Sequence, residues 1–530
     1  MAEVTRIGGG GGFWGDQTMA PVNLLEQSEL DYLTMDYLAE VTMSIMHKQL
    51  ERDAEAGWAS DLKTWLEVGG IDLLYKKKVR LVTNAGGANP RACASMVLSA
   101  ASAIGWNDCK VGIVIGDDLT NRLTGIAATG EKFTHMFDEG LGSLLDYADN
   151  VVSANAYLGA GGVARCLERG ADIVITGRTA DASLIVGCML HSCGWSKNAE
   201  ENGLNICGPI ETWYDGDTEV ALDIIAGWTV AGHLIECGAQ VSGGNSSDWK
   251  MIGDLENLGY PIAEVSGDGT CIITKPAGTQ GSVTKRTVSE QLLYEIGDPS
   301  SYHTPDCTVD ITSVTLEDIA LDRVEVKGAK GRRPPETLKI SATHRDGWFA
   351  AAELAVPGPD CIRKAKHLDE TLRNRLAHLR DMEIHSEFLG HGFLKPPGLR
   401  QENHEPSEVI IRWAATSNSK KSLQEFGRSI APLVLTGPAG ICGYGARPRP
   451  REQLRFFPTT VNRVLIEPQV HLKIMHSWRH ELEIRMPWID ERFFDKLESM
   501  ARVERGVKAK IAGHVLRKLE GVKISDAHHK

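Results

Sequence analysis

The sequence lacks any apolar run of about 20 residues, the length that a helix needs to cross a bilayer. It also lacks an export signal, because Met1–Asp16 contains no basic segment followed by an apolar run. Its last residues, His528-His529-Lys530, differ from a peroxisomal address of the Ser-Lys-Leu type. From these absences we expect a soluble, cytoplasmic protein that makes no membrane contact.

Cysteine pairs of the CxxC type are absent as well. The 11 cysteines are spread irregularly from Cys93 to Cys442, and an odd, scattered set does not predict a disulfide framework. The tightest group, Cys188-x-x-His191-x-Cys193, lacks the second half that a zinc site needs. We therefore expect free thiols in a reducing compartment and assign no residue to a metal.

An extended basic patch is also missing. The chain has 57 Lys and Arg against 70 Asp and Glu, and its net charge of -13 repels nucleic acid and anionic membranes. No Gly-x-Ser-x-Gly elbow of a serine hydrolase occurs, and no Lys-Ser/Thr pair completes a Walker loop after Gly8–Gly12. We expect a small molecule as the partner, rather than nucleic acid or a membrane.

What the first 180 residues do contain is a recurring unit of a β-branched run, a Gly- or Asn/Asp-rich turn and an amphipathic segment. This order is typical of βαβ units, with helices at 38–52 and 89–104. The predicted strands are Val4–Ile7, Tyr32–Tyr37, Val79–Thr83, Lys110–Ile115, Asn150–Ser153 and Asp172–Thr176. Right-handed crossovers make such strands mostly parallel, so the predicted fold class is α/β with a Rossmann-like sheet.

A chain of 530 residues is long for one domain. The pattern changes near residue 310, where β-rich sequence begins, followed by an amphipathic helix over Pro359–Leu379 and a strand over Glu408–Ala414. We predict a glycine-rich α/β ligand-binding domain over 1–310, a second, smaller α/β domain over 311–475 and a C-terminal extension over 476–530. The extension contains a predicted helix over Asp490–Val503.

Ligands of open parallel sheets bind beyond the carboxyl ends of the strands, so the turns there are the candidate site. The first turn offers Gly10, Gly11 and Asp16, with main-chain N–H groups that glycine leaves open to an anion. Its Gly10-x-Gly12-x-x-Gly15 spacing is nearly automatic inside a glycine run, and Pro21 interrupts the helix that a dinucleotide site needs. A flexible turn without a ligand is the alternative.

The later turns add polar groups to the same edge. After the third strand, Asn89 can cap a helix that begins with Pro90, which leaves the preceding glycines near a positive helix end. Arg178 and Asp181 can bind a carboxylate and move a proton, or they can pair with each other. The predicted ligand-binding residues of these turns are Asn84, Gly86, Gly87, Asn89, Arg91, Asn155 and Gly161, with Asp36, Glu40 and Asp117 nearby.

Two further features lie outside these turns. His233 and Glu236 share one face of a predicted helix over 220–237, where they form an acid/base pair, a structural contact or two metal ligands. Lys275, in a glycine-rich stretch, is placed to meet an anion or to lie exposed on a hairpin. The predicted catalytic residues are Asp16, Arg178, Asp181, His233 and Glu236.

The ordered set of these segments over residues 4–470 resembles the acyclic terpene utilisation family. The matching segments are Arg6-Ile7-Gly8 to Gly15-Asp16, Asn84-Ala85-Gly86-Gly87, Asn89-Pro90-Arg91, Thr176-Gly177-Arg178 with Asp181, Glu236-Cys237-Gly238 and Tyr294-Glu295-Ile296-Gly297-Asp298-Pro299. The resemblance implies a link to the catabolism of branched terpenoids through acyl-CoA thioesters. Relatives often carry a C-terminal ferredoxin-like domain, for which residues 476–530 are too short.

The sequence leaves three functions open. The first is a lyase, hydratase or hydrolase that acts by acid/base chemistry on a small carboxylate or acyl-CoA thioester, which would be a substrate rather than a cofactor. The second is a non-catalytic module that binds an acyl-CoA or a partner enzyme. The third is an enzyme that uses a divalent metal at the acidic turns. In each case we expect a homo-oligomer.

Overall fold

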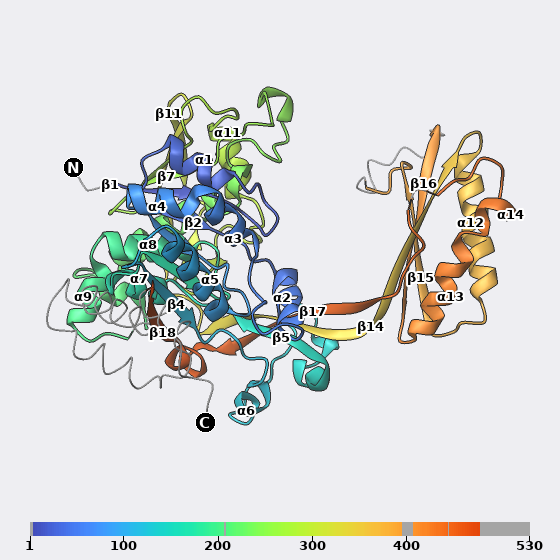
Figure 1. Cartoon of the computed structure of the whole chain (residues 1–530), viewed down its shortest axis with the longest axis horizontal. Helices are drawn as coiled ribbons and strands as arrows, with labels where there is room; N and C mark the ends of the chain where they lie inside the picture. Colours follow the sequence, from blue (N-terminus) through green and yellow to red (C-terminus); the bar gives the residue numbers. More distant parts are fainter. Residues whose placement is uncertain (1–3, 206–207, 395–405, 444, 478–530) are drawn as a thin grey trace, which may run out of the picture. The chain divides into compact units, whose positions relative to one another are not determined.

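A computed structural model describes residues 4–205, 208–394, 406–443 and 445–477. These residues form two compact units (Figure 1). The described part of unit 1 comprises residues 4–146, 153–342 and 458–477, and unit 2 comprises Tyr147–Val152 and Thr343–Phe457. The predicted helix over Asp490–Val503 lies outside the described residues.

Unit 1 is organised by a ten-stranded mixed sheet in the order β11-β12-β8-β7-β1-β2-β3-β6-β4-β18. Its five central strands are parallel: β1 (Val4–Gly9), β2 (Tyr32–Met35), β3 (Arg80–Thr83), β6 (Ile173–Thr176) and β4 (Lys110–Ile115). Antiparallel strands extend both edges: β7 (Ile262–Ser266), β8 (Cys271–Thr274), β12 (Arg323–Lys327) and β11 (Thr315–Ala320) on one side, β18 (His471–His476) on the other.

The central strands are short and apolar because helices cover both of their faces. All four residues of β2 and all four of β6 are buried, as expected for a parallel sheet with no solvent-facing side. The helices of unit 1 are α1 (Ala20–Gln27), α2 (Glu40–Leu50), α3 (Asp61–Trp65), α4 (Ile71–Lys77), α5 (Pro90–Ala103), α6 (Leu123–Ala127), α7 (Gly161–Glu168), α8 (Ser183–Ser192), α9 (Trp195–Glu201), α10 (Thr218–Ile235) and α11 (Lys285–Leu292).

Helix α10 is the central helix of unit 1. Among the described residues it is the one helix long and apolar enough to cross a membrane, with a mean hydropathy of 1.2, yet 78% of that window is buried inside the protein. It contacts α8, α11 and the small strand β13 (Lys330–Arg332). Strand β13 forms a second, three-stranded sheet with β10 (Thr308–Asp310) and β9 (Tyr302–His303). Core packing therefore accounts for the apolar composition of α10.

The main elements of unit 2 follow the order β-α-β-β-α-β, with the four-residue helix α14 (Leu433–Thr436) added after the second helix. The unit contains residues 343–357 of β14 (Thr337–Pro357), then α12 (Cys361–Leu376), β15 (Met382–Leu389), β16 (Glu408–Ser417), α13 (Lys420–Ile430), α14 and most of β17 (Arg451–Asn462). The strand order β15-β16-β14-β17 is that of a split βαβ, or ferredoxin-like, arrangement. The helices lie on one side of these strands (Figure 1), and Leu372 and Phe426 pack with Trp413 in their core.

The structure corrects the predicted sheet in two respects. The parallel arrangement holds for the five central strands, but the whole sheet is mixed because β-strands between 262 and 327 join one edge in antiparallel pairs. The predicted strand near Asn150–Ser153 is β5 (Val151–Ala156), which pairs with β14 outside that sheet. Strands β11 and β12, beyond the predicted boundary at 310, belong to unit 1.

The remaining short helical segments join these elements. They are η1 (Leu66–Gly70), η2 (Glu139–Leu141), η3 (Leu144–Asn150), η4 (Ile210–Trp213), η5 (Gly238–Gln240), η6 (Trp249–Met251), η8 (Arg463–Leu465) and η9 (Glu467–Gln469). Segment η5 is the continuation of the α10 chain after its last turn, which matters below because Glu236 lies between the two.

Candidate active site

The turns after β2, β3, β4 and β6 bring polar side chains together at one edge of the sheet. Asn84, after β3, donates from Nδ2 to Oδ1 of Asp36, after β2, over 2.7 Å. The backbone N–H of Arg178, after β6, donates to Oδ2 of Asp117, after β4, over 2.9 Å. These four strand ends therefore meet, as their position in a parallel sheet predicts.

A cavity of about 400 Å³ opens at this edge and lies within unit 1. Its wall carries Glu40, Tyr157, Arg178, Asp181, His233 and Glu236, together with Glu295, Tyr302, His303 and Lys339. Of the five residues to which the sequence assigns catalysis, all except Asp16 lie on this wall. Residues that follow β2 and β6, together with the end of α10, thus share one space.

Arg178 is held by the protein's own groups. Its side chain is 2% exposed, Nη1 donates to the carbonyl oxygen of Leu38 over 2.5 Å, and Nη2 donates to Oδ1 of Asp181 over 2.8 Å. The guanidinium carbon lies 4.1 Å from the centre of the Tyr157 ring, a cation–π distance. Of the two roles that the sequence leaves open, the structure forms the internal Arg178–Asp181 pair and not a free carboxylate clamp.

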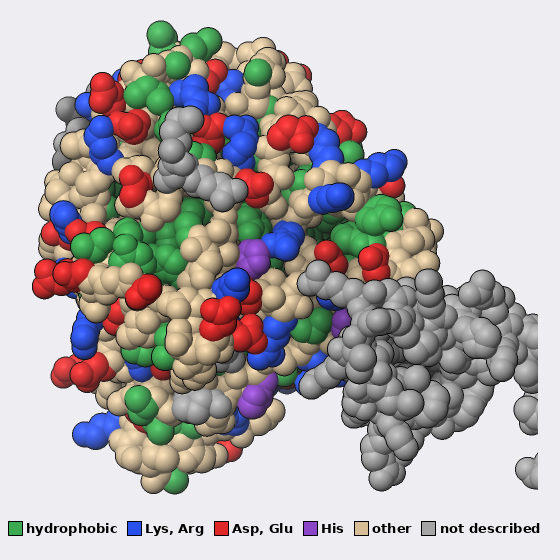
Figure 2. All heavy atoms as spheres, turned by 90° about the vertical axis from the view of Figure 1, so that its left-hand side faces the viewer, with side chains coloured by type: hydrophobic (Ala, Val, Ile, Leu, Met, Phe, Trp, Pro, Cys, Tyr) green, Lys and Arg blue, Asp and Glu red, His purple; other side chains and the backbone are tan. Residues whose placement is uncertain are grey.

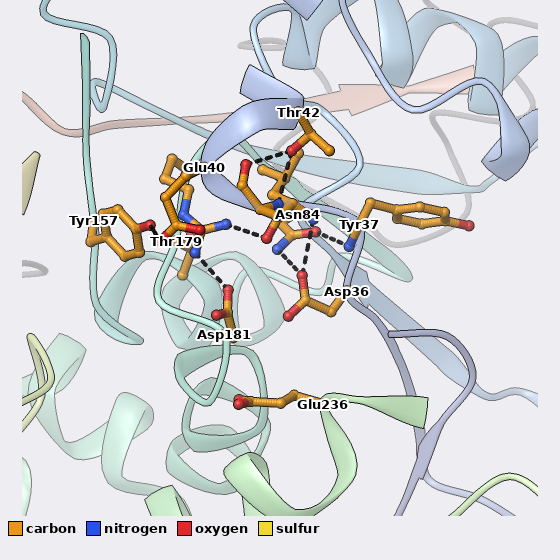
Figure 3. Close-up of polar contacts among 12 residues, drawn as sticks. Asp36, Tyr37, Glu40, Thr42, Asn84, Tyr157, Thr179, Asp181 and Glu236 are labelled. Atoms are coloured by element: carbon orange, nitrogen blue, oxygen red, sulfur yellow. Dashed lines mark hydrogen bonds and ion pairs between the residues drawn. The ribbon is translucent and has the colours of Figure 1, made fainter. Parts of the chain in front are cut away.

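Three carboxyl groups, those of Asp36, Asp181 and Glu236, lie in one part of the site (Figure 3) and interact electrostatically. Burial, together with the charge of Asp181, raises the pKa of Asp36 well above its usual value. Burial also raises the pKa of Asp181, although Arg178 opposes the change. Like charges in a poorly hydrated space resist joint ionisation, so burial and mutual repulsion both disfavour the ionised forms of Asp36 and Asp181, against the charge of Arg178.

Glu236 is the third member, and it pairs with His233. Nδ1 of His233 lies 3.0 Å from Oε1 of Glu236, and Nε2 lies 3.2 Å from the carbonyl oxygen of Leu292. Because a carbonyl can only accept, Nε2 carries a hydrogen, and one further proton is shared between Nδ1 and Oε1. Burial raises the pKa of Glu236 to about 7. Burial lowers the pKa of His233, but its bond to Glu236 outweighs this effect and raises the value.

The two oxygens of Glu236 are not equivalent. Oε1 is engaged by His233, whereas Oε2 is buried and has no hydrogen-bond partner among the described residues. The side chain is 10% exposed and lies on the cavity wall. Both nitrogens of His233 are occupied, so within this pair Oε2 is the atom with lone pairs available to another group.

A second ion pair lies on the same wall, on the Tyr157 ring that Arg178 also contacts. Nζ of Lys339 lies 3.0 Å from Oε1 of Glu40, which also accepts a hydrogen bond from the Tyr157 hydroxyl over 2.9 Å. Burial acts against ionisation of Glu40, but the neighbouring Lys339 charge outweighs it and lowers the pKa of Glu40 to about 2. Glu40 is therefore a carboxylate, and its negative charge balances the positive charge of Lys339.

The first glycine turn binds its own neighbours. Gly10 N–H donates to the carbonyl oxygen of Thr34 over 2.9 Å, and a β-carbon at Gly10 would lie 2.6 Å from Sδ of Met35. Gly11 accepts a hydrogen bond from the N–H of Asp36 over 3.1 Å. Neither glycine is on the cavity wall. Close packing against β2, rather than an anion, accounts for these two glycines.

Asp16 closes the same turn. Its Oδ2 accepts a hydrogen bond from the N–H of Gly12 over 2.9 Å, and its Oδ1 accepts one from the Tyr260 hydroxyl over 2.5 Å. Asp16 is away from the cavity wall. The prediction that Asp16 shares a space with the other four catalytic candidates is therefore wrong, because its carboxylate holds the loop that carries it.

The second glycine turn is a helix start, as predicted. Asn89 precedes Pro90 at the first position of α5 and accepts a hydrogen bond from the N–H of Ala92 over 3.2 Å. Gly86 is required because a β-carbon would lie 2.5 Å from the carbonyl oxygen of Thr176. Gly86 lets the turn after β3 pass close to the end of β6. The Asn84 amide holds the Asp36 carboxyl through its hydrogen bond. Of the predicted ligands here, Asn84, Gly86, Gly87, Asn89 and Arg91, none is on the cavity wall.

The other predicted ligands also contact the protein itself. Asn155 donates from Nδ2 to Oδ2 of Asp117 over 2.9 Å. Gly161, at the start of α7, lines a separate cavity of about 30 Å³. Lys275 lies 3.1 Å from Oδ2 of Asp322, so the anion predicted for it is a carboxylate of the chain. Asn155 thus supports Asp117, whereas neither Gly161 nor Lys275 is on the wall of the candidate site.

Several residues of the cavity wall were not predicted from the sequence. Tyr302 and His303 form the short strand β9, and Lys339 comes from β14, far along the chain from the glycine turns. One signal was present for Lys339: it lies between Leu338 and Ile340, both buried, so strand alternation places it on the other face. Nothing local marks β9 as part of the site.

Metal and thiol chemistry receive no support from the geometry. Within the described ranges, no group of three or more His, Cys, Asp and Glu side chains is arranged to hold a metal ion. His191, in the cysteine group that the sequence singled out, contacts Tyr32 and Arg80 instead. Burial raises the pKa of the Cys237 thiol above its usual range, which disfavours a thiolate nucleophile there.

Fold and site together define a mixed α/β protein with a carboxyl-rich cavity at the carboxyl ends of its parallel strands. The sequence model of the acyclic terpene utilisation family protein AtuA matches residues 5–202 and 205–472. The chain therefore belongs to the acyclic terpene utilisation family, which confirms the resemblance drawn from the motifs. Comparisons with curated proteins and with solved structures found no match.

Proposed function

We propose that this protein is an enzyme that acts on a small carboxylate or an acyl-CoA thioester by acid/base chemistry. The reaction is a hydration, an elimination or a hydrolysis, in the metabolism of terpenoid or branched acids. The observation that carries the proposal is Oε2 of Glu236, a buried carboxyl oxygen that has no hydrogen-bond partner within the described part of the chain and belongs to a residue on the cavity wall. Its pKa of about 7 is the value at which one group both accepts and returns protons near neutral pH.

Each member of the cluster has a distinct task in this proposal. Oε2 of Glu236 takes a proton from water or from the carbon next to the substrate carbonyl. His233 touches no substrate and acts as a positioning residue, because it fixes Oε1 and shares its proton. Arg178 holds Asp181, one-third exposed, on the cavity wall as a carboxylate, and Glu236 returns the proton to the product.

The test uses crotonate and its N-acetylcysteamine thioester as probes. Loss of the conjugated absorbance reports hydration, and release of thiol reports hydrolysis. We expect turnover that falls at least about a hundredfold in Glu236→Gln, the usual loss when a general acid/base group is removed. Glu325→Gln is the matched control, since Glu325 pairs with Lys327 on β12 away from the cavity wall.

The outcomes separate the proposal from a non-catalytic module. Binding of the thioester without turnover, unchanged by Glu236→Gln, would favour a module that binds an acyl group or a partner enzyme. Turnover abolished by a chelator and restored by a divalent ion would favour a metal-dependent reaction. His233→Asn should shift the pH profile of turnover more than its maximum, because the substituted side chain no longer shares a proton with Glu236.

We also propose a soluble, cytoplasmic protein that self-associates, with the five central strands as a Rossmann-like core. The core position of α10 supports solubility. On the face drawn in Figure 2, Lys and Arg side chains are interspersed with Asp and Glu and form no continuous basic field. Such a surface favours a small-molecule partner over nucleic acid.

A further inference from the structure

The cavity wall contains cations, but each already has an anion. Arg178 is paired with Asp181, and Lys339 is paired with Glu40. No Lys or Arg on the described part of the wall is left without a carboxylate. The remaining titratable wall groups include Glu295 and His303, one acidic and one basic. A ligand carboxylate that enters would therefore meet no lysine or arginine whose charge is not already balanced by a carboxylate of the protein.

The carboxyl groups outnumber these cations. Glu40, Asp181, Glu236 and Glu295 line the space, against the two cations Arg178 and Lys339. Asp36 is not on the wall, but its charge interacts with those of Asp181 and Glu236 as well as with that of Arg178. A further negative charge placed among them would be repelled, or it would enter as the neutral acid.

The same wall suits an uncharged polar group. A carboxyl group that keeps its proton donates a hydrogen bond, which a carbonyl oxygen accepts. Tyr157 and Tyr302 supply aromatic surface on the wall. A carbonyl flanked by carbon atoms matches protonated carboxyls and ring faces better than a carboxylate does.

We propose that the cavity takes the uncharged acyl group of an ester or thioester and discriminates against the corresponding free carboxylate. The inference rests on the proposed function, because it chooses between the two substrate classes left open there. The juxtaposition that carries it is the pairing of both wall cations with protein carboxylates inside a carboxyl-rich cavity.

The first experiment measures binding rather than turnover. Isothermal titration calorimetry compares crotonate with its N-acetylcysteamine thioester, each in two buffers that differ in ionisation enthalpy. We expect the thioester to bind at least tenfold more tightly and with little net proton uptake, and any carboxylate binding to take up close to one proton. Equal or tighter binding of crotonate without proton uptake would overturn the inference.

The second experiment changes the charge of the wall. Glu40→Gln keeps an oxygen for the Tyr157 hydroxyl but removes the anion of Lys339. The freed ammonium should improve crotonate binding by about tenfold, the size of one charge-assisted hydrogen bond, and so should reduce the preference for the thioester over crotonate. Glu325→Gln, which frees Lys327 away from the wall, is the matched control and should change neither affinity.

The two proposals fail in different ways. Turnover of crotonate at the rate of the thioester would overturn the selectivity and leave acid/base catalysis standing. Tight thioester binding with no turnover would contradict the enzyme and leave the selectivity standing. If neither probe binds at millimolar concentration, the cavity does not take small acyl groups, and both proposals fall.

Discussion

The pH dependence of stability gives the sharpest check on the His233–Glu236 pair. In Glu236→Gln, the amide can donate to Nδ1 of His233 while Nε2 keeps its bond to Leu292, so the variant imitates the protonated pair. The substitution preserves the size of the side chain and removes its ability to ionise. It therefore isolates the cost of the buried charge.

The magnitude follows from the displaced pKa. Burial raises the pKa of Glu236 from 4.5 to about 7, so between these values the folded protein holds a proton that the unfolded chain releases. The contribution of Glu236 to stability is therefore fully present below about pH 4.5 and is lost as pH rises towards 7, by about 3 kcal/mol in total. Glu236→Gln should match the wild type near pH 5 and exceed its unfolding free energy by roughly that amount at pH 8.

Urea titrations followed by amide hydrogen exchange of α10 peptides measure this difference in unit 1 directly. Glu325→Gln serves as the control, since Glu325 is a surface partner of Lys327, and its pH profile should follow the wild type. If Glu236→Gln loses as much stability between pH 5 and pH 8 as the wild type does, Glu236 does not hold the proton and the account of the pair is refuted.

Two further predictions concern packing and the buried arginine. Gly86→Ala should lower the unfolding free energy by about 1–3 kcal/mol, because the new β-carbon would lie 2.5 Å from the carbonyl oxygen of Thr176. Gly125→Ala is the control, since a β-carbon there meets open space, and it should raise the unfolding free energy by up to about 1 kcal/mol. Arg178→Met should lower the unfolding free energy measured in urea by about 3–5 kcal/mol, because it leaves the Asp181 carboxylate without its partner. A decrease of less than about 1 kcal/mol would contradict this prediction.

Much of the parallel core could be predicted because its signals are local. A β-branched run followed by a turn and an amphipathic segment identifies each of β1, β2, β3, β4 and β6 without reference to the rest of the chain. The antiparallel edges could not be predicted in the same way. Strand β7 pairs with β1 across more than 250 residues, and nothing in either sequence names its partner.

The same distinction governs the site. Arg178–Asp181 and His233–Glu236 are pairs separated by three residues, so local geometry brings them together and the sequence could nominate them. Lys339 contributes from a strand 299 residues from its partner Glu40. Whether Arg178 binds a ligand carboxylate or pairs with a carboxylate of the protein depends on such distant neighbours. The sequence therefore did not decide between these two roles.

The glycine run shows why composition misdirected part of the prediction. A glycine marks a place where something approaches the backbone closely, but the residue does not say whether a ligand or another backbone does so. Here a β-carbon at Gly9 would lie 2.5 Å from the carbonyl oxygen of Ile235, and one at Gly12 would lie 2.6 Å from the carbonyl carbon of Cys237. Those two residues flank Glu236, so the run fixes the end of α10 against β1 and thereby sets where the unpartnered carboxyl oxygen lies. The glycines serve the site through the position of Glu236, without touching its cavity.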